Sequence, residues 1–356
     1  MSEQKSKKMM VRVLIIGLFV LMLTGITTIP CSAEEPIQIV YSQFEMKGSH
    51  WDVNFCTPWF AELDKRTNGR IKIEAHWGSE LAGLFEAYDS IAKGVIDMGM
   101  ILPTMFGEKF PMDGILIFNS VNIDNHRPAQ AYYDLYMKFP EFQKSYEKTP
   151  LVALSPTPCN YLATRKGKAI RKMEDCKGLK MPGAGPAPEA RQKVVGIIPV
   201  SIPPSDMYMA LKTGTCDGLA IMIYSLEDFK WLDVLTNATK VSINGGVWAH
   251  VMSKNAWDKL PADIQKVFKD MIPWLAELSD RAYNLKTKDA VERYPTQYGT
   301  EIIELSQEEL DRWAAADDKA LDAYAAELDK RGLPGTKAKD DFRMLQKKYS
   351  ATEYDF

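Results

Sequence analysis

The chain has 356 residues, with 47 acidic and 44 basic side chains and a formal net charge of −3 at pH 7. This length accommodates two domains of ordinary size. The mildly acidic composition has no basic stripe, which argues against nucleic acid as a partner.

The first 33 residues have the layout of a secretory signal peptide. A basic N-terminal region precedes the apolar stretch Val13–Leu23, and small residues follow at Cys31–Ala33. An uncleaved membrane anchor is the alternative, but the apolar stretch is shorter than the ~20 residues that a span needs. We therefore predict a periplasmic protein in which 1–33 is a cleaved signal peptide, with no stable membrane insertion after cleavage.

Strand and helix patterns alternate after the signal peptide, which favours a parallel α/β architecture. A strand over 37–41 leads through a glycine-containing loop into a helix with aromatic residues at helical spacing. A strand over 71–75, a helix over about 83–93 and a strand over 95–102 follow.

The middle of the chain repeats this alternation before the pattern becomes helical. The predicted strands cover 151–154, 161–164, 179–181, 216–222, 239–243 and 248–252, with helices over about 186–195 and 206–213. A long helix follows, and Pro273 is expected to kink it. We expect a first lobe from 34–158 and 248–287, a second lobe from 159–247 and 288–330, and a C-terminal helical tail over 331–356.

The sequence carries few signals of catalysis. Its four histidines show no metal-ligand spacing, and it lacks the zinc-protease, nucleophile-elbow and phosphate-loop motifs. We therefore predict a protein that is not an enzyme and has no metal and no cofactor. An enzyme whose residues assemble only in three dimensions is the alternative.

Three loops follow predicted strands, where open α/β sheets bind their ligands. They are Gly48–Trp51, Pro103–Met105 and Pro182–Gly185. Each could instead be a plain turn, with Trp51 packed in a core. The third loop has glycines before a predicted helix, so its backbone N–H groups could form a cradle for an anion.

Four cysteines remain after the signal peptide: Cys56, Cys159, Cys176 and Cys216. Export to an oxidising compartment permits disulfides. A Cys176–Cys216 pair and a set of four buried free thiols both remain open.

Three segments together resemble the solute-binding proteins of TRAP (tripartite ATP-independent periplasmic) transporters, of the dicarboxylate-receptor type. The first is Phe60–Ile73 with its continuation Gly94–Gly99, the second is Tyr208–Gly218, and the third is Asn255–Pro261. The segments occur in the order and separation of that family, and the similarity extends from about residue 37 to 330.

The resemblance implies a two-lobed periplasmic-binding-protein fold, type II-like, with a long kinked helix spanning both lobes. It also implies closure around a small-molecule ligand and delivery to integral-membrane TRAP permease subunits. Such receptors mostly carry organic acids, which an arginine commonly holds. Here the two usual arginine positions are occupied by Leu162 and Pro182.

An enclosed carboxylate without a partner is costly, so the missing arginines leave three solutions. Another cation could replace them (Arg165, Lys166, Lys168 or Lys180), the glycine-loop amides could hold the anion, or the ligand could be an amine or an aromatic compound. We favour an organic anion. A periplasmic sensory binding subunit is the alternative to a transport receptor. The expected ligand contacts are His50, Trp51, Thr104, Tyr161, Gly183, Ala184, Tyr224 and Trp248.

Overall fold

The computed structural model describes residues 35–118, 127–156, 159–183 and 186–350. Residues 1–33, the predicted signal peptide, and Ala184 therefore lie outside the described residues. From Ile37 onward the chain forms one compact unit. Among the described residues, none of the helices combines the length and the hydropathy needed to cross a bilayer.

The first sheet has five strands in the order β2-β1-β3-β10-β4. Strand β1 is parallel to β2 and β3, whereas β10 is antiparallel to both β3 and β4. The strands are β1 (Ile37–Ser42), β2 (Ile71–His76), β3 (Met98–Ile101), β4 (Leu151–Pro156) and β10 (Val247–Met252). The accompanying helices are η1 (Asp52–Cys56), α2 (Thr57–Arg66), α3 (Ala87–Ala92), η2 (Pro103–Phe106), η3 (Met112–Ile117), α4 (Pro128–Lys138), α5 (Pro140–Ser145) and α9 (Lys254–Lys259).

The second sheet has four strands in the order β11-β9-β5-β8, with a separate parallel pair β6-β7. Its strands are β5 (Cys159–Arg165), β8 (Gly218–Ile221), β9 (Leu235–Asn244) and β11 (Glu301–Glu304), and the pair is β6 (Lys180–Pro182) and β7 (Ile198–Val200). The helices of this part are η4 (Met173–Cys176), α6 (Pro186–Val194), η5 (Pro204–Asp206), α7 (Met207–Thr213) and α8 (Ser225–Asp228).

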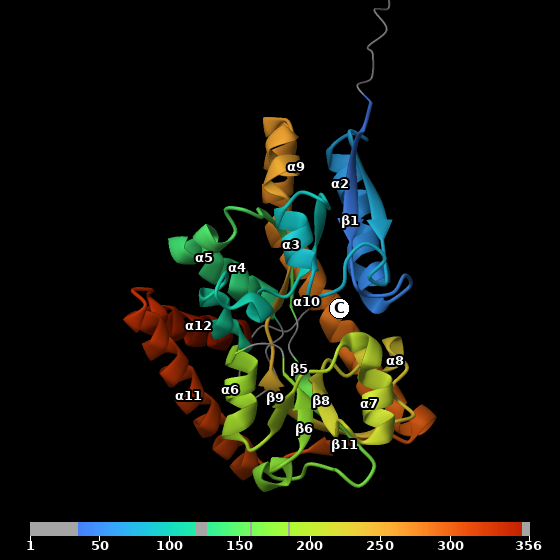
Figure 1. Ribbon diagram of the computed structural model, residues 1–356, viewed down its shortest axis with the longest axis vertical. Coiled ribbons are helices and arrows are strands. Elements are labelled where there is room, and N and C mark those ends of the chain that lie inside the picture. The colour runs from blue at the N-terminus through green and yellow to red at the C-terminus, as the bar shows by residue number, and fades with distance from the viewer. Residues whose placement is uncertain (1–34, 119–126, 157–158, 184–185, 351–356) are drawn as a thin grey trace, which may run out of the picture. The chain divides into compact units, whose positions relative to one another are not determined.

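Both faces of the second sheet are covered, because its strand residues alternate between two cores. Tyr161 and Ala163 on β5 belong to one core, and Leu162 between them belongs to another. Helices α7 and α8 lie on one flank of this sheet, and α6 lies on the other flank beside α11 (Gln307–Lys330) (Figure 1).

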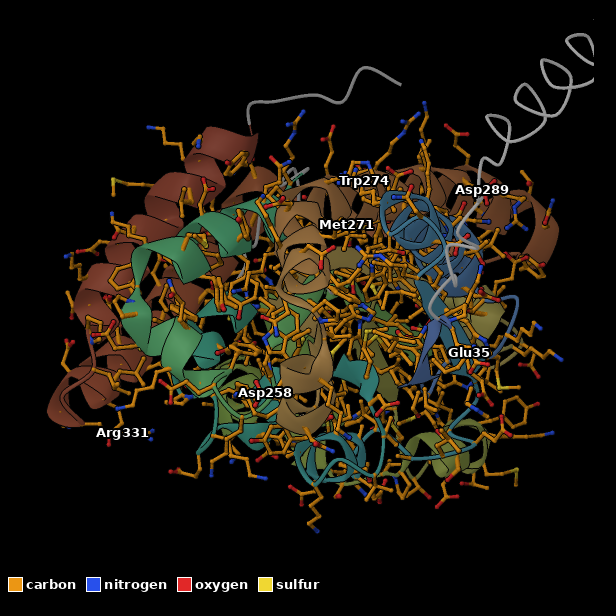
Figure 2. All side chains as sticks on the ribbon, turned by 90° about the horizontal axis from the view of Figure 1, so that it is seen from above. Glu35, Asp258, Met271, Trp274, Asp289 and Arg331 are labelled. Atoms are coloured by element: carbon orange, nitrogen blue, oxygen red, sulfur yellow. The ribbon has the colours of Figure 1, made fainter. Side chains whose placement is uncertain are left out.

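The helix α10 (Ala262–Tyr298) spans 37 residues and contacts elements of both sheets. It continues through Pro273 and Pro295, each of which removes one backbone hydrogen bond of the helix. Met271 and Trp274 lie on the stretch beside Pro273, and Asp289 lies farther along the same helix (Figure 2). After α11, the last described helix is α12 (Gly335–Ser350), which packs on α4 and η3.

Each sheet has its own helices, and the chain connects the two sheets between β4 and β5, between β9 and β10, and through α10. This arrangement confirms the two-lobed α/β fold. The lobes are named below by their sheets. The boundaries expected from the sequence stay predictions; α10 itself continues to Tyr298, beyond the expected boundary at 287.

The expected parallel architecture holds for only some of the strand pairs. Strands β5, β8 and β9 pair antiparallel, as do β10 and its neighbours. Strand direction depends on which distant segments pair, and that pairing leaves no trace in local periodicity. Periodicity also missed two short strands and three helices: β7, β11, α4, α5 and α8.

Candidate functional site

Chain segments with polar and aromatic residues gather at one edge of the first sheet. Strands β1 and β3 end there, and they lead into the loop 43–51 and into η2. Because β10 is antiparallel to β3, its beginning lies at the same edge, and this places Trp248 beside the end of β3. The antiparallel direction therefore brings Trp248 to the edge where Trp51 and Thr104 were expected.

The second sheet contributes the end of β8 and the beginning of β5. Tyr161 pairs with Ile221, so the segment that follows β8 starts beside Tyr161. Within that segment, the Tyr224 ring meets the His50 ring edge-on, with their centroids 4.7 Å apart. His50 also lies 5.5 Å from the ring of Trp51. One contact between the lobes thus joins three of the expected site residues.

Trp248 and Thr104 lie close to the same loop. The Trp248 ring is 5.1 Å from the ring of Phe44, which is in the loop after β1. Thr104 lies in η2, and η2 contacts both β10 of the first lobe and α6 of the second. The structure therefore places six of the expected residues, from both lobes, around facing strand ends.

Four of these residues carry buried polar atoms that have no hydrogen-bond partner among the described residues. They are His50 Nε2, Trp51 Nε1, Thr104 Oγ1 and Trp248 Nε1. An indole N–H can only donate. Unpaired buried polar groups are uncommon, and each calls for an explanation such as a ligand. The core residues Trp59 and Trp313 also have an unpaired indole N–H, so a single one is not diagnostic.

The His50 ring supplies a third buried N–H donor beside those of Trp51 and Trp248. Burial, together with the positive charge of Lys286, lowers the pKa of His50 to about 3, so the ring is neutral at pH 7. Its Nδ1 lies 2.8 Å from the Asn54 side-chain nitrogen, which is a donor, so Nδ1 is assigned as the acceptor and Nε2 as the protonated nitrogen. The Ala282 carbonyl lies near the ring without completing a hydrogen bond to Nε2.

The two tyrosines are part of the packed core at the lobe contact. Tyr161 and Tyr224 are each 3% exposed, and Tyr224 Oη donates to the Met222 sulfur at 2.9 Å. The Tyr224 carbonyl accepts a hydrogen bond from Tyr294 of α10 at 3.0 Å. These contacts fix the segment after β8 against the long helix.

The glycine loop after β6 does not offer a free amide at Gly183. That N–H donates to the Val200 carbonyl at 3.1 Å. The Glu189 side chain also lies against Gly183, where an added Cβ would come within 2.7 Å of it. The first turn of α6 therefore faces its own carboxylate, which argues against an anion cradle at Gly183. Ala184 and Gly185 lie outside the described residues.

The cations that could have replaced the arginine gather at the opposite end of the second sheet. Arg165 and Lys168 lie 3.8 and 3.7 Å from the Asp217 carboxylate, and the backbone N–H of Lys180 also donates to it. Asp217 precedes β8, whereas the lobe contact follows β8. These side chains neutralise Asp217 at a distance from Tyr161 and Tyr224.

The two positions of the missing arginines have structural roles. Leu162 is fully buried with Ile170 and Val241, on the sheet face opposite Tyr161. The Pro182 carbonyl accepts a hydrogen bond from the Gln192 side chain at 2.8 Å.

Sequence reasoning missed residues that lie close to the expected site residues in the chain or in space, chiefly Phe44, Glu45 and Asp228. Phe44 and Glu45 directly follow β1, and the rule that pointed to Gly48–Trp51 could have found them. Asp228 lies at the end of α8, a helix of one turn that periodicity does not reveal.

The described cysteine side chains form no disulfide. Cys56, Cys176 and Cys216 are free and buried, so the Cys176–Cys216 pair is absent. The Cys216 thiol instead donates to the Gly218 carbonyl at 3.1 Å. The Cys159 side chain lies outside the described residues.

Comparison with known proteins gives a consistent result. The family described as bacterial extracellular solute-binding protein, family 7, matches residues 44–328. A solute-binding protein of Albidiferax ferrireducens is 26% identical over 260 residues, which cover 71% of this chain and 75% of the relative. The C4-dicarboxylate-binding periplasmic protein DctP of Rhodobacter capsulatus is 25% identical over 304 residues, covering 78% of this chain and 84% of that protein.

A solved structure has the same fold. The TRAP periplasmic solute-binding protein of Bordetella bronchiseptica with bound mandelate superimposes with a TM-score of 0.78 at 21% identity, covering 88% of this chain and 99% of that chain. The family match extends over most of the sequence and includes every strand after β1. The chain therefore belongs to the bacterial extracellular solute-binding proteins of family 7.

Proposed function

We propose that this receptor binds an organic acid between its lobes in the periplasm and delivers it unchanged to the membrane subunits of a TRAP transporter. The observation that carries the proposal is the set of buried N–H donors at His50, Trp51 and Trp248, for which the described residues supply no acceptor. A site that offers donors selects a ligand that offers acceptors, and a carboxylate is rich in acceptors.

Neutral donors can replace the missing arginine in energetic terms. A hydrogen bond to a charged group contributes about 1.5–3 kcal/mol. Three such bonds offset much of the several kcal/mol that the burial of a carboxylate costs. The surrounding rings of Phe44, Trp51 and Trp248 favour an acid with a flat or apolar body.

Relatives support the same ligand class. The Rhodobacter capsulatus protein is described as binding C4-dicarboxylates, and the Bordetella bronchiseptica structure holds mandelate. We extend this class to the present chain. The same proposal includes three further points. The lobes divide at the boundaries expected from the sequence, residues 1–33 are removed, and the ligand is delivered to a permease.

A thermal-shift comparison of acids with their amides tests the ligand class. A ligand that binds only the folded protein raises its melting temperature. We expect mandelate or succinate to raise the melting temperature of the chain from Glu34 onward, and mandelamide or succinamide to do so much less. Recovery of the ligand after incubation should show it unchanged.

Two results would contradict the proposal. One is a panel in which amines or neutral compounds stabilise the chain and organic acids do not. The other is conversion of a bound acid to a product, which would identify an enzyme.

A further inference from the structure

The π-helical turn η1 directly follows two of the expected ligand contacts, His50 and Trp51. The backbone N–H of Thr57 donates to the Asp52 carbonyl, five residues back, whereas an α-helix bonds four residues back. Turns of this kind are rare and frequently occur at functional sites. The side chains of this turn are therefore candidates for a role in the neighbouring site.

Asn54 is a side chain of this turn that contacts His50. Its amide nitrogen lies 2.8 Å from Nδ1 of the His50 ring, and it also donates to the backbone carbonyl of His50 at 3.1 Å. Asn54 is half-buried, whereas His50 is buried. The Asn54 side chain therefore reaches back over one turn of the helix and links the His50 ring to the His50 backbone.

The backbone carbonyl of His50 determines which way the Asn54 amide points. A carbonyl oxygen only accepts hydrogen bonds, and of the two ends of an amide side chain only the nitrogen donates. If the amide were turned over, two acceptors would lie 3.1 Å apart. The amide nitrogen therefore faces His50, and Nδ1 of the neutral ring accepts its hydrogen bond. The proton of the neutral ring is then on Nε2.

The surroundings of the His50 ring agree with this position of the proton. The Ala282 carbonyl near the ring is also a group that only accepts hydrogen bonds. The rings of Tyr224 and Trp51 pack against the imidazole, with centroids 4.7 and 5.5 Å away. Packing thus fixes the position of the ring, and Asn54 fixes the position of its proton.

We propose that Asn54 is a specificity-determining residue that sets the hydrogen-bonding polarity of His50, so that the receptor prefers a carboxylate to the corresponding amide. Among the three donors of the proposed ligand region, the indoles of Trp51 and Trp248 can only donate, but a neutral imidazole can donate or accept at Nε2. Asn54 makes His50 a donor as well. A carboxylate accepts from all three groups, whereas an amide turns its own N–H groups toward one of them.

Nitrogen-15 spectra of the ligand-free, histidine-labelled chain from Glu34 onward test the tautomer. They distinguish a protonated ring nitrogen from an unprotonated one, and the signals of His50 are those that disappear in His50→Gln. At pH 7 we expect a proton on Nε2 and none on Nδ1. A proton on Nδ1 in the unaltered chain would overturn the inference.

Two substitutions of similar size change the group that faces Nδ1. Asn54→Leu deletes the donor, so we expect both tautomers to be populated. Asn54→Asp replaces the donor with an acceptor, so we expect a proton to appear on Nδ1. Thr57→Val is the matched control, because it deletes the 3.0 Å hydrogen bond from Thr57 to Asp52 in the same turn and should leave the tautomer unchanged. An unchanged tautomer in both Asn54 variants would contradict the inference.

Calorimetry with mandelate and mandelamide tests the consequence for ligand choice, which rests on the proposed function. Asn54→Leu should lower the ratio of the two affinities roughly two- to tenfold, because only a fraction of the rings then presents an N–H at Nε2. Thr57→Val should leave this ratio unchanged.

A double-mutant cycle shows whether Asn54 acts through His50. In His50→Gln, the new amide side chain supplies its own N–H, so adding Asn54→Leu should no longer change the affinity ratio. A full effect of Asn54→Leu in that background would mean that Asn54 acts through packing, against the inference. If the tautomer follows Asn54 but organic acids do not bind the unaltered chain, the proposed ligand class is wrong, and Asn54 still sets the polarity of His50.

Discussion

Two buried polar regions of this receptor differ in how completely their donors are paired. Arg191 of α6 is buried beside Asp317 of α11, and its Nε donates to that carboxylate. Its two terminal nitrogens donate to the carbonyls of Ile117 and Ser242 at 2.6 and 3.0 Å. At the lobe contact, by contrast, the N–H groups of Trp51 and Trp248 have no acceptor among the described residues.

The difference shows how the chain divides its polar groups between structure and ligand. Arg191 ties α6 to α11, to the last residue of η3 and to β9, so its positive charge is already neutralised within the fold. The region proposed to bind the ligand instead keeps neutral donors, which can remain unpaired in the empty receptor at a lower cost than a buried charge. A receptor built in this way can bind an acid without a dedicated arginine.

The largest expected effect on stability comes from disrupting the region around Arg191, in which the donors are paired. Arg191→Met leaves the Asp317 carboxylate buried with only Arg343, 3.3 Å away, as a cation. We expect the free energy of unfolding to fall by about 3–5 kcal/mol, as when one partner of a buried pair is removed. Urea denaturation followed by circular dichroism measures this change.

Arg312→Met is the matched control for that change. Arg312 pairs with Glu174 on the surface, where the side chains are 43% and 54% exposed. An exposed pair of this kind contributes about 0–1 kcal/mol. If the two variants lost equal stability, the structural role assigned to Arg191 would be wrong.

A smaller effect is expected from removing one unpaired donor. Trp248→Phe keeps an aromatic ring and deletes the indole N–H, so we expect affinity for the stabilising acid to fall roughly ten- to hundredfold. The free energy of unfolding of the empty receptor should change by no more than about 1 kcal/mol, because no hydrogen bond is lost. Titration calorimetry and urea denaturation give the two quantities.

Trp313→Phe makes the same chemical change in α11. Trp313 is 1% exposed, and its indole N–H is also unpaired. This variant should bind the acid with unchanged affinity. Equal losses of affinity in the two variants would mean that Trp248 affects binding through packing rather than through its N–H.

The smallest effect is expected at Arg165, one of the cations that the sequence offered as a substitute for the missing arginine. Its side chain lies near Asp217 and donates to the Leu211 carbonyl at 3.2 Å. Arg165→Met should therefore change affinity for the acid by less than about twofold, a change smaller than one neutral hydrogen bond. A tenfold loss of affinity, measured by calorimetry, would mean that Arg165 contributes to ligand binding.

Sequence reasoning predicted residues at the lobe contact more successfully than it predicted which groups could hold the ligand. Strand ends are readable from periodicity, so His50, Trp51 and Thr104 were found as loop residues after predicted strands. Strand direction is not readable, and the parallel expectation failed for β5 and β10. The expected site residues on these strands still lie at the facing strand ends, because an antiparallel strand begins where its neighbour ends.

Features that depend on distant pairing were beyond sequence reasoning. The Arg191–Asp317 pair joins residues 126 positions apart, and no local pattern connects them. The Gly183 cradle was plausible from glycine and helix signals, but the pairing of β6 with β7 occupies its N–H.

Indole N–H signals give the most direct test of whether unpaired donors bind the ligand. In a nitrogen-15 correlation spectrum of the labelled receptor, each of the eight tryptophans contributes one such signal, and substitutions to phenylalanine assign them. On saturation with the stabilising acid, we predict downfield shifts for Trp51 and Trp248, as new hydrogen bonds form, and none for Trp313. A saturated receptor in which the Trp51 and Trp248 signals stay in place would contradict the account.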